Sequence, residues 1–339
     1  MDSQPSETRH SRRTVLGLGL GAAVTAAASG PAPAASRPGT AGGSGAGTAD
    51  GSGAGSPDVS GSGAPGGSGP DDADLHRRLA ALEQEHSARL GVHARNLTTG
   101  RTVRYRADEL FPICSVFKTV AVAAVLRDLD RDGAFLARRI RYGRADLDRA
   151  GGAPITGKPE NLANGMTVAD LCAAAIDHSD NAAANLLLRE LGGPTAVTRF
   201  CRSIGDRVTR LDRWEPELNS AEPDRITDTT SPQAIAGSYT RLVLGDALPA
   251  AGREQLTAWL RANTTSTHRF REGLPPDWTL ADKTGTGSHG TTNDVGIAWT
   301  PAGAPIVLAV LTTKPADAAA PKDEPLVAAA AALLAPVLG

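Results

Sequence analysis

The sequence has 339 residues, a length typical of about two domains, and its 35 basic and 37 acidic residues give a formal net charge of −2. This balance excludes the basic surface of a typical nucleic-acid-binding protein, and three cysteines are too few for a disulfide scaffold. Beyond the first 35 residues no apolar run is long enough to cross a membrane, and 13 of the 38 glycines fall between positions 39 and 69.

The first 36 residues have the features of an export signal. Arg12 and Arg13 precede an apolar run over residues 17–28, and positions 32–34 read Ala-Pro-Ala, a pattern of small residues typical of a cleavage site. These features resemble a twin-arginine signal peptide, which predicts a secreted or extracytoplasmic protein. Residues 37–72 are mainly Gly, Ser, Ala, Pro and Asp, with almost nothing large to bury, so we expect a disordered linker there.

The folded part is expected to begin with a helix and a hairpin. Leu75, Leu79 and Leu82 recur at helical spacing, which predicts an amphipathic helix over residues 74–90. Strands are then predicted at 92–97 and 102–105, joined by a turn of sequence Thr-Thr-Gly.

The middle of the chain is helical in character, and strands return near the C-terminus. One predicted helix begins at Thr167, where Thr at the cap and Asp170 three residues later form a near-variant of the capping box. Other helices are predicted over 115–130, 180–191, 194–204, 231–244, 249–262 and 324–338. Strands are predicted over 279–284, 292–299 and 305–312.

Strands near both ends and helices between them predict a fold of the α/β (α+β) class. We expect one antiparallel sheet built from both termini and flanked by helices, with an all-helical domain inserted. The folded domain would span residues 73–339, with an α/β lobe over 73–111 and 263–339 and a helical lobe over 112–262.

The first candidate for chemistry is the pair Ser115 and Lys118. The chain has only five lysines but thirty arginines. A buried lysine can give up its proton, whereas an arginine cannot. A helix beginning near Ser115 would place both side chains on one face. A lysine of lowered pKa could then remove the serine proton and create a nucleophile. Taken alone, the pair also fits a capped surface helix.

Two further motifs have similar alternatives. Ser-Asp-Asn at 179–181 precedes a predicted helix, where it also fits an ordinary N-cap cluster. Lys-Thr-Gly-Thr-Gly at 283–287 ends a predicted strand, where a lysine and threonines could hold a carboxylate and glycine lets a ligand's backbone lie close. Taken alone, the second motif also fits a glycine-rich turn.

In this order, Ser-x-x-Lys, Ser-Asp-Asn and Lys-Thr-Gly form the motif set of class A β-lactamases and penicillin-binding proteins. The sequence resembles a class A serine β-lactamase from Asp74 to its C-terminus. Residues 213–219 match the omega-loop motif of that family, in which a glutamate and an asparagine four residues later hold the hydrolytic water. The resemblance therefore makes Glu215 the general base for deacylation and gives Asn219 a share in holding the water. Penicillin-binding proteins lack this glutamate.

The omega loop would explain turnover, because a serine ester persists until a base within hydrogen-bond reach activates water against it. In the family, the proline at position 216 follows a cis peptide bond, which is inexpensive only before proline. Arg213 and Asp228 match the pair that closes the loop by a salt bridge.

The resemblance also assigns the residues of the acylation step. Ser115 would be the nucleophile, and Lys118 or Glu215 acting through water would accept its proton. Ser179 would relay a proton to the leaving β-lactam nitrogen.

Substrate binding is assigned in the same way. Asn181 would contact the side-chain amide of the substrate, and Lys283 with Thr284 would hold its carboxylate. The backbone N–H groups of Ser115 and Thr286 would form the oxyanion hole, in which each donor often contributes about 3 kcal/mol.

One position departs from the commonest family pattern. Many members carry an arginine on the strand after Lys-Thr-Gly, where this chain has Thr292. Other members supply the guanidinium from a Thr-Thr-x-x-x-Arg segment, which matches residues 264–269 here. The resemblance therefore assigns Arg269 to the substrate carboxylate; the alternative is an ordinary surface arginine.

The cysteines Cys114, Cys172 and Cys201 allow at most one bridge, and buried free thiols are the favoured interpretation. Some carbapenem-hydrolysing members bridge the cysteine before the nucleophile to a position that is Gly287 here. The other family bridge would need a cysteine at Val122. Because neither bridge can form, the resemblance does not imply carbapenemase activity.

The sequence therefore predicts an exported class A serine β-lactamase that hydrolyses penicillins and cephalosporins through an acyl-serine intermediate and confers resistance. No cofactor or metal is expected, since the seven histidines lack ligand spacing. The expected partners are small β-lactam substrates, with no nucleic acid and no stable membrane anchor, and a monomer is expected. The alternatives are a D,D-carboxypeptidase or transpeptidase acting on cell-wall peptide, and a β-lactam-sensing module without turnover.

Overall fold

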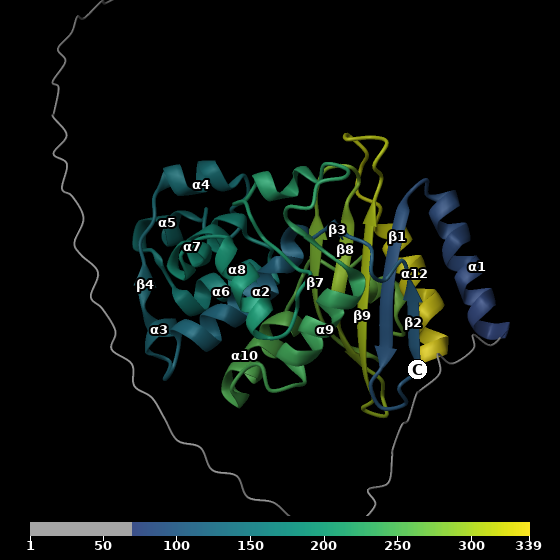
Figure 1. Ribbon diagram of the computed structural model, residues 1–339. Coiled ribbons are helices and arrows are strands. Elements are labelled where there is room, and N and C mark those ends of the chain that lie inside the picture. The colour runs from purple at the N-terminus through teal and green to yellow at the C-terminus, as the bar shows by residue number, and fades with distance from the viewer. Residues whose placement is uncertain (1–69) are drawn as a thin grey trace, which may run out of the picture. The chain divides into compact units, whose positions relative to one another are not determined.

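The computed structural model describes residues 70–339 (Figure 1). The expected signal peptide lies outside the described residues, and so does the expected linker except for positions 70–72, which begin helix α1 (Pro70–Glu85). Within the described part, no helix combines the length and the hydropathy needed to cross a membrane.

A five-stranded antiparallel sheet is assembled from both ends of the described chain, in the order β2-β1-β9-β8-β7. Its strands are β1 (Arg89–Asn96), β2 (Thr102–Tyr105), β7 (Thr279–Thr286), β8 (Thr292–Trp299) and β9 (Pro305–Thr313). Strand β1 pairs with β2 on one side and with β9 on the other, so that His93 lies opposite both Arg104 and Ala309. The three predicted C-terminal strands and the N-terminal hairpin are confirmed, and β7 extends two residues beyond its predicted end.

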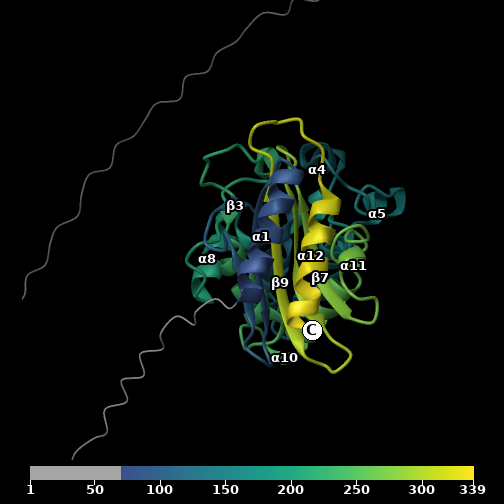
Figure 2. The same ribbon diagram turned by 90° about the vertical axis from the view of Figure 1, so that its right-hand side faces the viewer.

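Helices α1 and α12 (Glu324–Leu338) lie side by side on one face of the sheet (Figure 2). Leu79 and Leu334 are fully buried there against Leu308 of β9. The short helix α11 (Phe270–Gly273) packs on α12. This layer holds the first of the two large cores.

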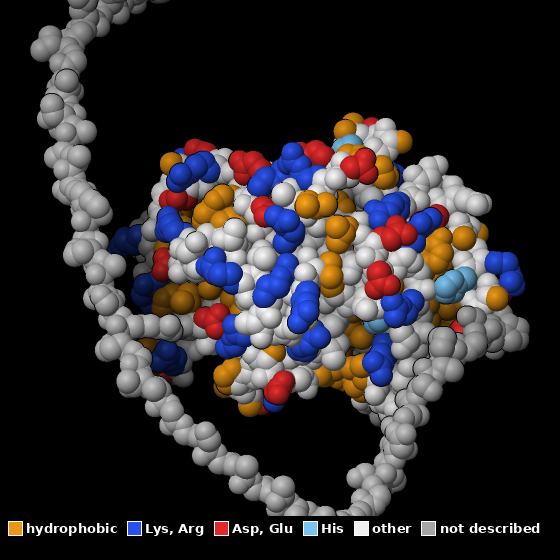
Figure 3. Space-filling model, in the orientation of Figure 1, with side chains coloured by type: hydrophobic (Ala, Val, Ile, Leu, Met, Phe, Trp, Pro, Cys, Tyr) orange, Lys and Arg blue, Asp and Glu red, His pale blue; other side chains and the backbone are white. Residues whose placement is uncertain are grey.

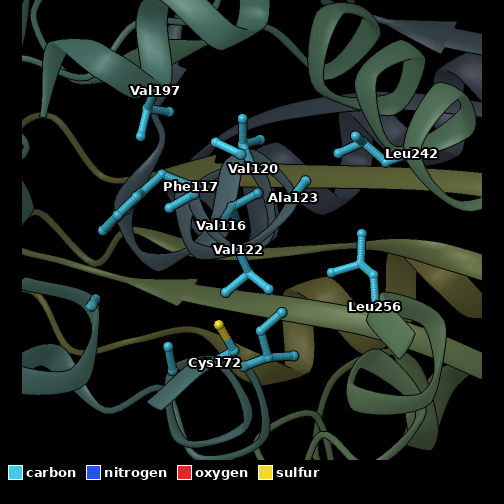
Figure 4. Close-up of a cluster of buried hydrophobic side chains, with 14 of the residues drawn as sticks. Val116, Phe117, Val120, Val122, Ala123, Cys172, Val197, Leu242 and Leu256 are labelled. Carbon is cyan, nitrogen blue, oxygen red and sulfur yellow. The ribbon is translucent and has the colours of Figure 1, made fainter. Parts of the chain in front are cut away.

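The opposite face of the sheet is covered by the long middle segment, which holds the second core. Helix α9 (Pro232–Val243) packs on the sheet, and α2 (Phe117–Ala124) is buried along its whole length. Figure 4 shows the core around α2, with side chains of Val116, Phe117, Val120, Val122, Ala123, Cys172, Val197, Leu242 and Leu256. Because α2 is enclosed on all sides, the residues at its N-terminus are held firmly.

The rest of the middle segment is mostly helical. It contains the 3-10 turns η1 (Cys114–Val116) and η3 (Glu217–Ser220), the π-helical turn η2 (Val125–Leu129), and helices α3 (Ala134–Ala137), α4 (Arg144–Ala150), α5 (Pro159–Asn164), α6 (Val168–Asp177), α7 (Asn181–Leu191), α8 (Thr195–Ser203) and α10 (Ala250–Arg261). Two ladders of two-residue strands interrupt it: β3 (Phe111–Pro112) with β6 (Thr229–Thr230), and β4 (Arg139–Ile140) with β5 (Met166–Thr167). The inserted part is therefore helical in character without being all-helical.

The local predictions differ from the structure mainly at element ends. The helix predicted over 74–90 ends at Glu85, because Ser87 adopts a left-handed φ of 47° and Leu90 is buried in β1 opposite Thr312. The capping box at Thr167 is confirmed: its side chain accepts the Asp170 N–H at 3.1 Å, and Asp170 accepts the Thr167 N–H in return.

Candidate active site

The three motifs and the omega loop meet at one cavity of about 410 Å³. It is lined by Ser115, Ser179, Asn181, Asn219, Thr265, Arg269, Thr284, Thr286, Lys322 and Glu324. Two larger hollows in the described part, of about 860 and 720 Å³, contain none of the serine and lysine motifs, although Glu215 and its omega-loop neighbours line the second of them. The convergence of polar groups, not the volume, therefore marks the smaller cavity as the candidate site.

Ser115 lies in η1, at the entry to α2, and only 7% of its surface is exposed. The preceding residue, Cys114, has a φ of 45°, and the buried η1 lies against β7. A Cβ atom at Gly285 would lie 3.1 Å from Ile113 O and 3.2 Å from Cys114 Cβ. The glycine thus makes room for η1, and the close approach of a ligand's backbone stays a prediction.

Lys118 connects the serine motifs with the omega loop. Its ammonium donates to Asn181 Oδ1 at 2.6 Å and to Ser179 O at 2.8 Å, and lies 3.3 Å from Ser179 Oγ. It also forms an ion pair of 3.1 Å with Glu215 Oε1, in which both side chains are fully buried. The same carboxylate oxygen lies 3.4 Å from Ser115 Oγ, so one atom faces both the serine and the lysine.

Lys283 reaches the same serine motif from β7. Its Nζ donates to Ser179 Oγ at 3.1 Å and to Thr284 O at 2.9 Å, and its side chain is fully buried. Burial, together with the nearby charges of Lys118 and Arg269, holds the pKa of Lys283 well below its ordinary value. Ser179 therefore lies between two lysines and has a left-handed φ of 55°.

The Ser-Asp-Asn motif provides the expected N-cap. Asp180 is the N-cap of α7, accepting the Ala183 N–H at 2.8 Å, and it also accepts from the backbone and hydroxyl of Thr156. It is fully buried, so it fixes the start of the helix. The residues on either side of this cap, Ser179 and Asn181, face the cavity.

The omega loop presents Glu215, which is 1% exposed, next to Asn219. The Asn219 side-chain amide donates to Glu215 Oε2, while Asn219 Oδ1 is buried and has no partner among the described residues. The Glu215–Pro216 peptide bond is cis. Arg213 and Asp228 form the expected ion pair, and Asp228 also accepts the Arg213 N–H at 3.0 Å.

Arg269 is a buried arginine, not a surface one. Its guanidinium donates to Gly285 O at 2.9 Å, to Asn293 O at 2.8 Å and to Thr286 Oγ1 at 2.7 Å. Its Nε lies 3.3 Å from Oε1 of Glu324, which also lines the cavity. This places the charge at the end of β7, where the Thr284 and Thr286 side chains also lie.

Comparison with known proteins agrees with this geometry. Residues 74–337 match the Beta-lactamase enzyme family. A β-lactamase of Streptomyces albus G is 59% identical over 337 residues, covering 99% of both chains. The chain belongs to the class A β-lactamase family. The solved structure of a β-lactamase from Streptomyces albus G is similar with a TM-score of 0.78 and 66% identity, covering 78% of this chain and 100% of that one. A mutant of the last common ancestor of Gram-negative bacteria β-lactamase class A gives a TM-score of 0.72 at 50% identity, covering 77% and 97%.

Several residues of this class A β-lactamase site had no sequence signal of their own. Asn185 holds the Glu215 backbone, and two residues at the start of α12 line the cavity: Lys322 just before the helix and Glu324, its first residue. Asn185 lies four residues after Asn181 on α7, so helical periodicity could have placed it on the same face. Lys322 and Glu324 are distant in sequence from every motif, and only the tertiary fold brings them in.

All three cysteines of this class A β-lactamase are free and buried, as expected. Burial raises the pKa of each thiol well above its ordinary value, which keeps the thiols protonated. Gly287 adjoins Cys114: a Cβ there would lie 2.7 Å from Cys114 Sγ and 2.7 Å from Asn219 O. Gly287, which follows β7, therefore lies in close contact with both η1 and the omega loop.

Proposed function

We propose that this class A serine β-lactamase opens the β-lactam ring with Ser115 and releases the product with Glu215, and so confers resistance to penicillins and cephalosporins. The observation that carries the proposal is the position of one carboxylate. Glu215 Oε1 faces Ser115 Oγ at 3.4 Å, and Oε2 accepts from the Asn219 side-chain amide. A base within reach of the nucleophile and of a water-holding amide can serve both half-reactions.

In acylation, Ser115 Oγ attacks the ring carbonyl and its proton passes to Glu215, because this carboxylate is the acceptor that the hydroxyl faces. The ammonium of Lys118, 3.1 Å away, stabilises the carboxylate charge and orients it. The ring C–N bond breaks as the nitrogen takes a proton from Ser179 Oγ. Ser179 is then reprotonated by Lys118 or Lys283, whose amines lie 3.3 and 3.1 Å from its Oγ. Glu215 passes the serine proton to Lys118, 3.1 Å away, so the lysine regains its proton and Glu215 is a carboxylate again before deacylation.

In deacylation, Glu215 removes a proton from a water molecule that Asn219 Oδ1 also holds, and the water attacks the ester carbonyl. The ester C–O bond breaks, and Ser115 Oγ recovers its proton from Glu215. The buried and otherwise unpartnered Asn219 Oδ1 is the acceptor that such a water molecule requires. The backbone N–H groups of Ser115 and Thr286 would stabilise the oxyanion in both steps.

Substrate binding would use the cations at the end of β7. We assign the ring carboxylate of the substrate to Lys283, Thr284 and Arg269, and its side-chain amide to Asn181. A bound carboxylate would offset the repulsion between Lys283 and its cationic neighbours, which strengthens binding of anionic substrates.

The test is steady-state kinetics of the mature chain on a penicillin, a cephalosporin, a carbapenem and a D-Ala-D-Ala peptide. We expect fast turnover of the penicillin and the cephalosporin and no turnover of the peptide. Peptide hydrolysis at a comparable kcat/KM would instead favour a carboxypeptidase, and a stable acyl-enzyme without turnover would favour a sensing module. Both alternatives form the same acyl-serine as a β-lactamase does, and neither requires Glu215.

We also propose that the chain is exported by the twin-arginine route and acts as a monomer. The sequence supports this with Arg12 and Arg13 before an apolar run, in residues outside the described part. Replacing both arginines by lysine keeps the charge and removes the motif. We expect the double variant to remain inside the cell, and secretion at the parental level would contradict the route.

A further inference from the structure

A hollow of larger volume than the β-lactam site lies outside that site and is lined by arginines. This groove, of about 860 Å³, runs between the β1–β2 edge of the sheet, helix α9 and the loop at 205–208. Arg95, Arg104, Arg207 and Arg241 line it, together with Asp108 and Asp206. Figure 3 shows Lys and Arg side chains gathered on the face where α9 lies in Figure 1. The groove is locally basic although the whole chain has a net charge of −2.

Strand register explains how the sheet contributes to this groove. His93 and Arg95 alternate with core residues along β1, so both side chains emerge on one face. Directly opposite them on β2 lie Arg104 and Thr102, which face the same way. Arg95 and Arg104 are exposed, whereas the His93 ring is mostly buried at the base of the groove.

Helix α9 completes the groove through Arg241. A Cβ at Gly237 would lie 3.3 Å from Arg241 Nη1, and a Cβ at Gly205 would lie 3.9 Å from Arg241 Nη2. The guanidinium therefore rests beside two glycines, which leave the space that it occupies.

The charges of the groove are only partly balanced. Arg104 pairs with Asp108 at 2.7 Å, and the buried Asp206 accepts from the Val208 and Thr209 N–H groups and from Ser238 Oγ. Arg95, Arg207 and Arg241 have no ion pair or side-chain hydrogen bond within the described part of the chain. Two buried polar atoms of the lining, His93 Nδ1 and Gln233 Oε1, also have no partner there.

We propose that this groove binds a polyol-phosphate polymer through its phosphodiester groups. Guanidinium groups match phosphate oxygens in a bidentate geometry, and three unpaired guanidiniums along one groove suit a ligand with several phosphates. The lining contains no Phe, Tyr or Trp, so it offers no platform on which nucleic-acid bases could stack. A recess lined from both sides suits a single flexible chain better than the flat surface of a bilayer.

The experiment measures binding of poly(glycerol phosphate) to the full chain at increasing salt, with inorganic phosphate, oligothymidylate and phosphatidylglycerol vesicles as comparison ligands. We expect the polymer to bind more tightly than the other three at equal phosphate concentration. Arg95→Ala and Arg241→Ala should each weaken binding about 5- to 10-fold, and each should lower the slope of log K against log salt by about one.

The matched control is Arg78→Ala, which removes an exposed arginine of α1 away from the groove and should leave binding unchanged. Hydrolysis of a penicillin by each variant at the parental kcat/KM will show that the fold is intact. Equal weakening by Arg78→Ala, tighter binding of oligothymidylate or of the vesicles, or an absence of polymer binding at low salt would overturn the proposal.

Discussion

The Asn185 side chain bonds to both polar groups of the Glu215 backbone. Its amide donates to Glu215 O at 2.9 Å, and Asn185 Oδ1 accepts the Glu215 N–H at 3.0 Å. Asn185 stands on α7, which Asp180 caps at its first turn. The position of the carboxylate is therefore set by a rigid helix as well as by the omega loop itself.

Asn185→Ala should slow deacylation more than acylation, because it frees the Glu215 backbone and leaves its two polar groups unpaired. Loss of a paired buried group costs about 1–3 kcal/mol, so thermal stability should fall as well. Pre-steady-state kinetics will separate the two steps. The control is Asn161→Ala on α5, which removes the 2.9 Å hydrogen bond from the Asn161 side chain to Ile155 O. A similar fall in the deacylation rate of this variant would mean that stability alone is responsible.

Glu215→Ala should slow both half-reactions and deacylation the more. Lys118 remains as the other acceptor for the Ser115 proton, whereas the base that activates water is gone, so the acyl-enzyme should accumulate. General-base catalysis contributes about 10²–10⁴-fold, so kcat for a penicillin should fall within that range or beyond it. Mass spectrometry of the intact protein will detect the ester mass. Glu217→Ala, which removes an exposed acid of the same loop, should turn over normally. Parental turnover by Glu215→Ala would assign the base elsewhere.

Arg269→Ala should raise KM for substrates that carry the ring carboxylate and lower kcat/KM about 10-fold or more, as expected for a lost charge-assisted contact. It also leaves the carbonyls of Gly285 and Asn293 without their donor, so a lower melting temperature is expected. Arg271→Ala provides the comparison, since Arg271 is exposed and does not line the cavity. If both variants showed the same kinetics, Arg269 would have no role in substrate binding.

Gly287→Ala should impair deacylation, because its Cβ would lie 2.7 Å from the backbone oxygen of Asn219. That oxygen accepts the Ser288 N–H at 2.9 Å, so the added methyl group would push the omega loop and the end of β7 apart. Gly143→Ala adds a methyl group where no atom lies within 4 Å and should be neutral. A crystal structure and the deacylation rate of both variants will check this, and an undisturbed omega loop would contradict it.

Asp177→Asn should stabilise the protein at neutral pH. Burial raises the pKa of Asp177 from 3.8 to about 6, and its Oδ1 is buried without a partner in the described residues. Between those two pH values the folded chain binds more protons than the unfolded chain, so stability falls as pH rises through this window. The variant should therefore melt higher than the parent above this window and no higher below it. Asp246→Asn, at an exposed position, should show no such pH dependence.

The sequence allowed accurate prediction where one signal was strong and local. Strand β9 contains a long apolar run, and the Thr167 capping box places both partners within three residues. The site motifs could be named because each is contiguous and the family order is specific. The chemical function of Asn185, by contrast, depends on a contact 30 residues away, and the close approach of η1 to Gly285 depends on two segments about 170 residues apart. Such contacts are set by tertiary packing and leave no periodic pattern.

The pairing of β1 with β9 determines when this chain can fold. His93 and Ala309 are 216 positions apart, and β9 lies in the middle of the sheet, between β1 and β8. Contacts so distant in sequence form late, because a long loop must close first. A ribosome must therefore release almost the whole polypeptide before the sheet can close, and until then the N-terminal hairpin exposes an unpaired edge. A chain that stops before Pro305 would lack the central strand and be prone to aggregation, so proteolytic loss of the C-terminal segment should inactivate the enzyme completely rather than gradually.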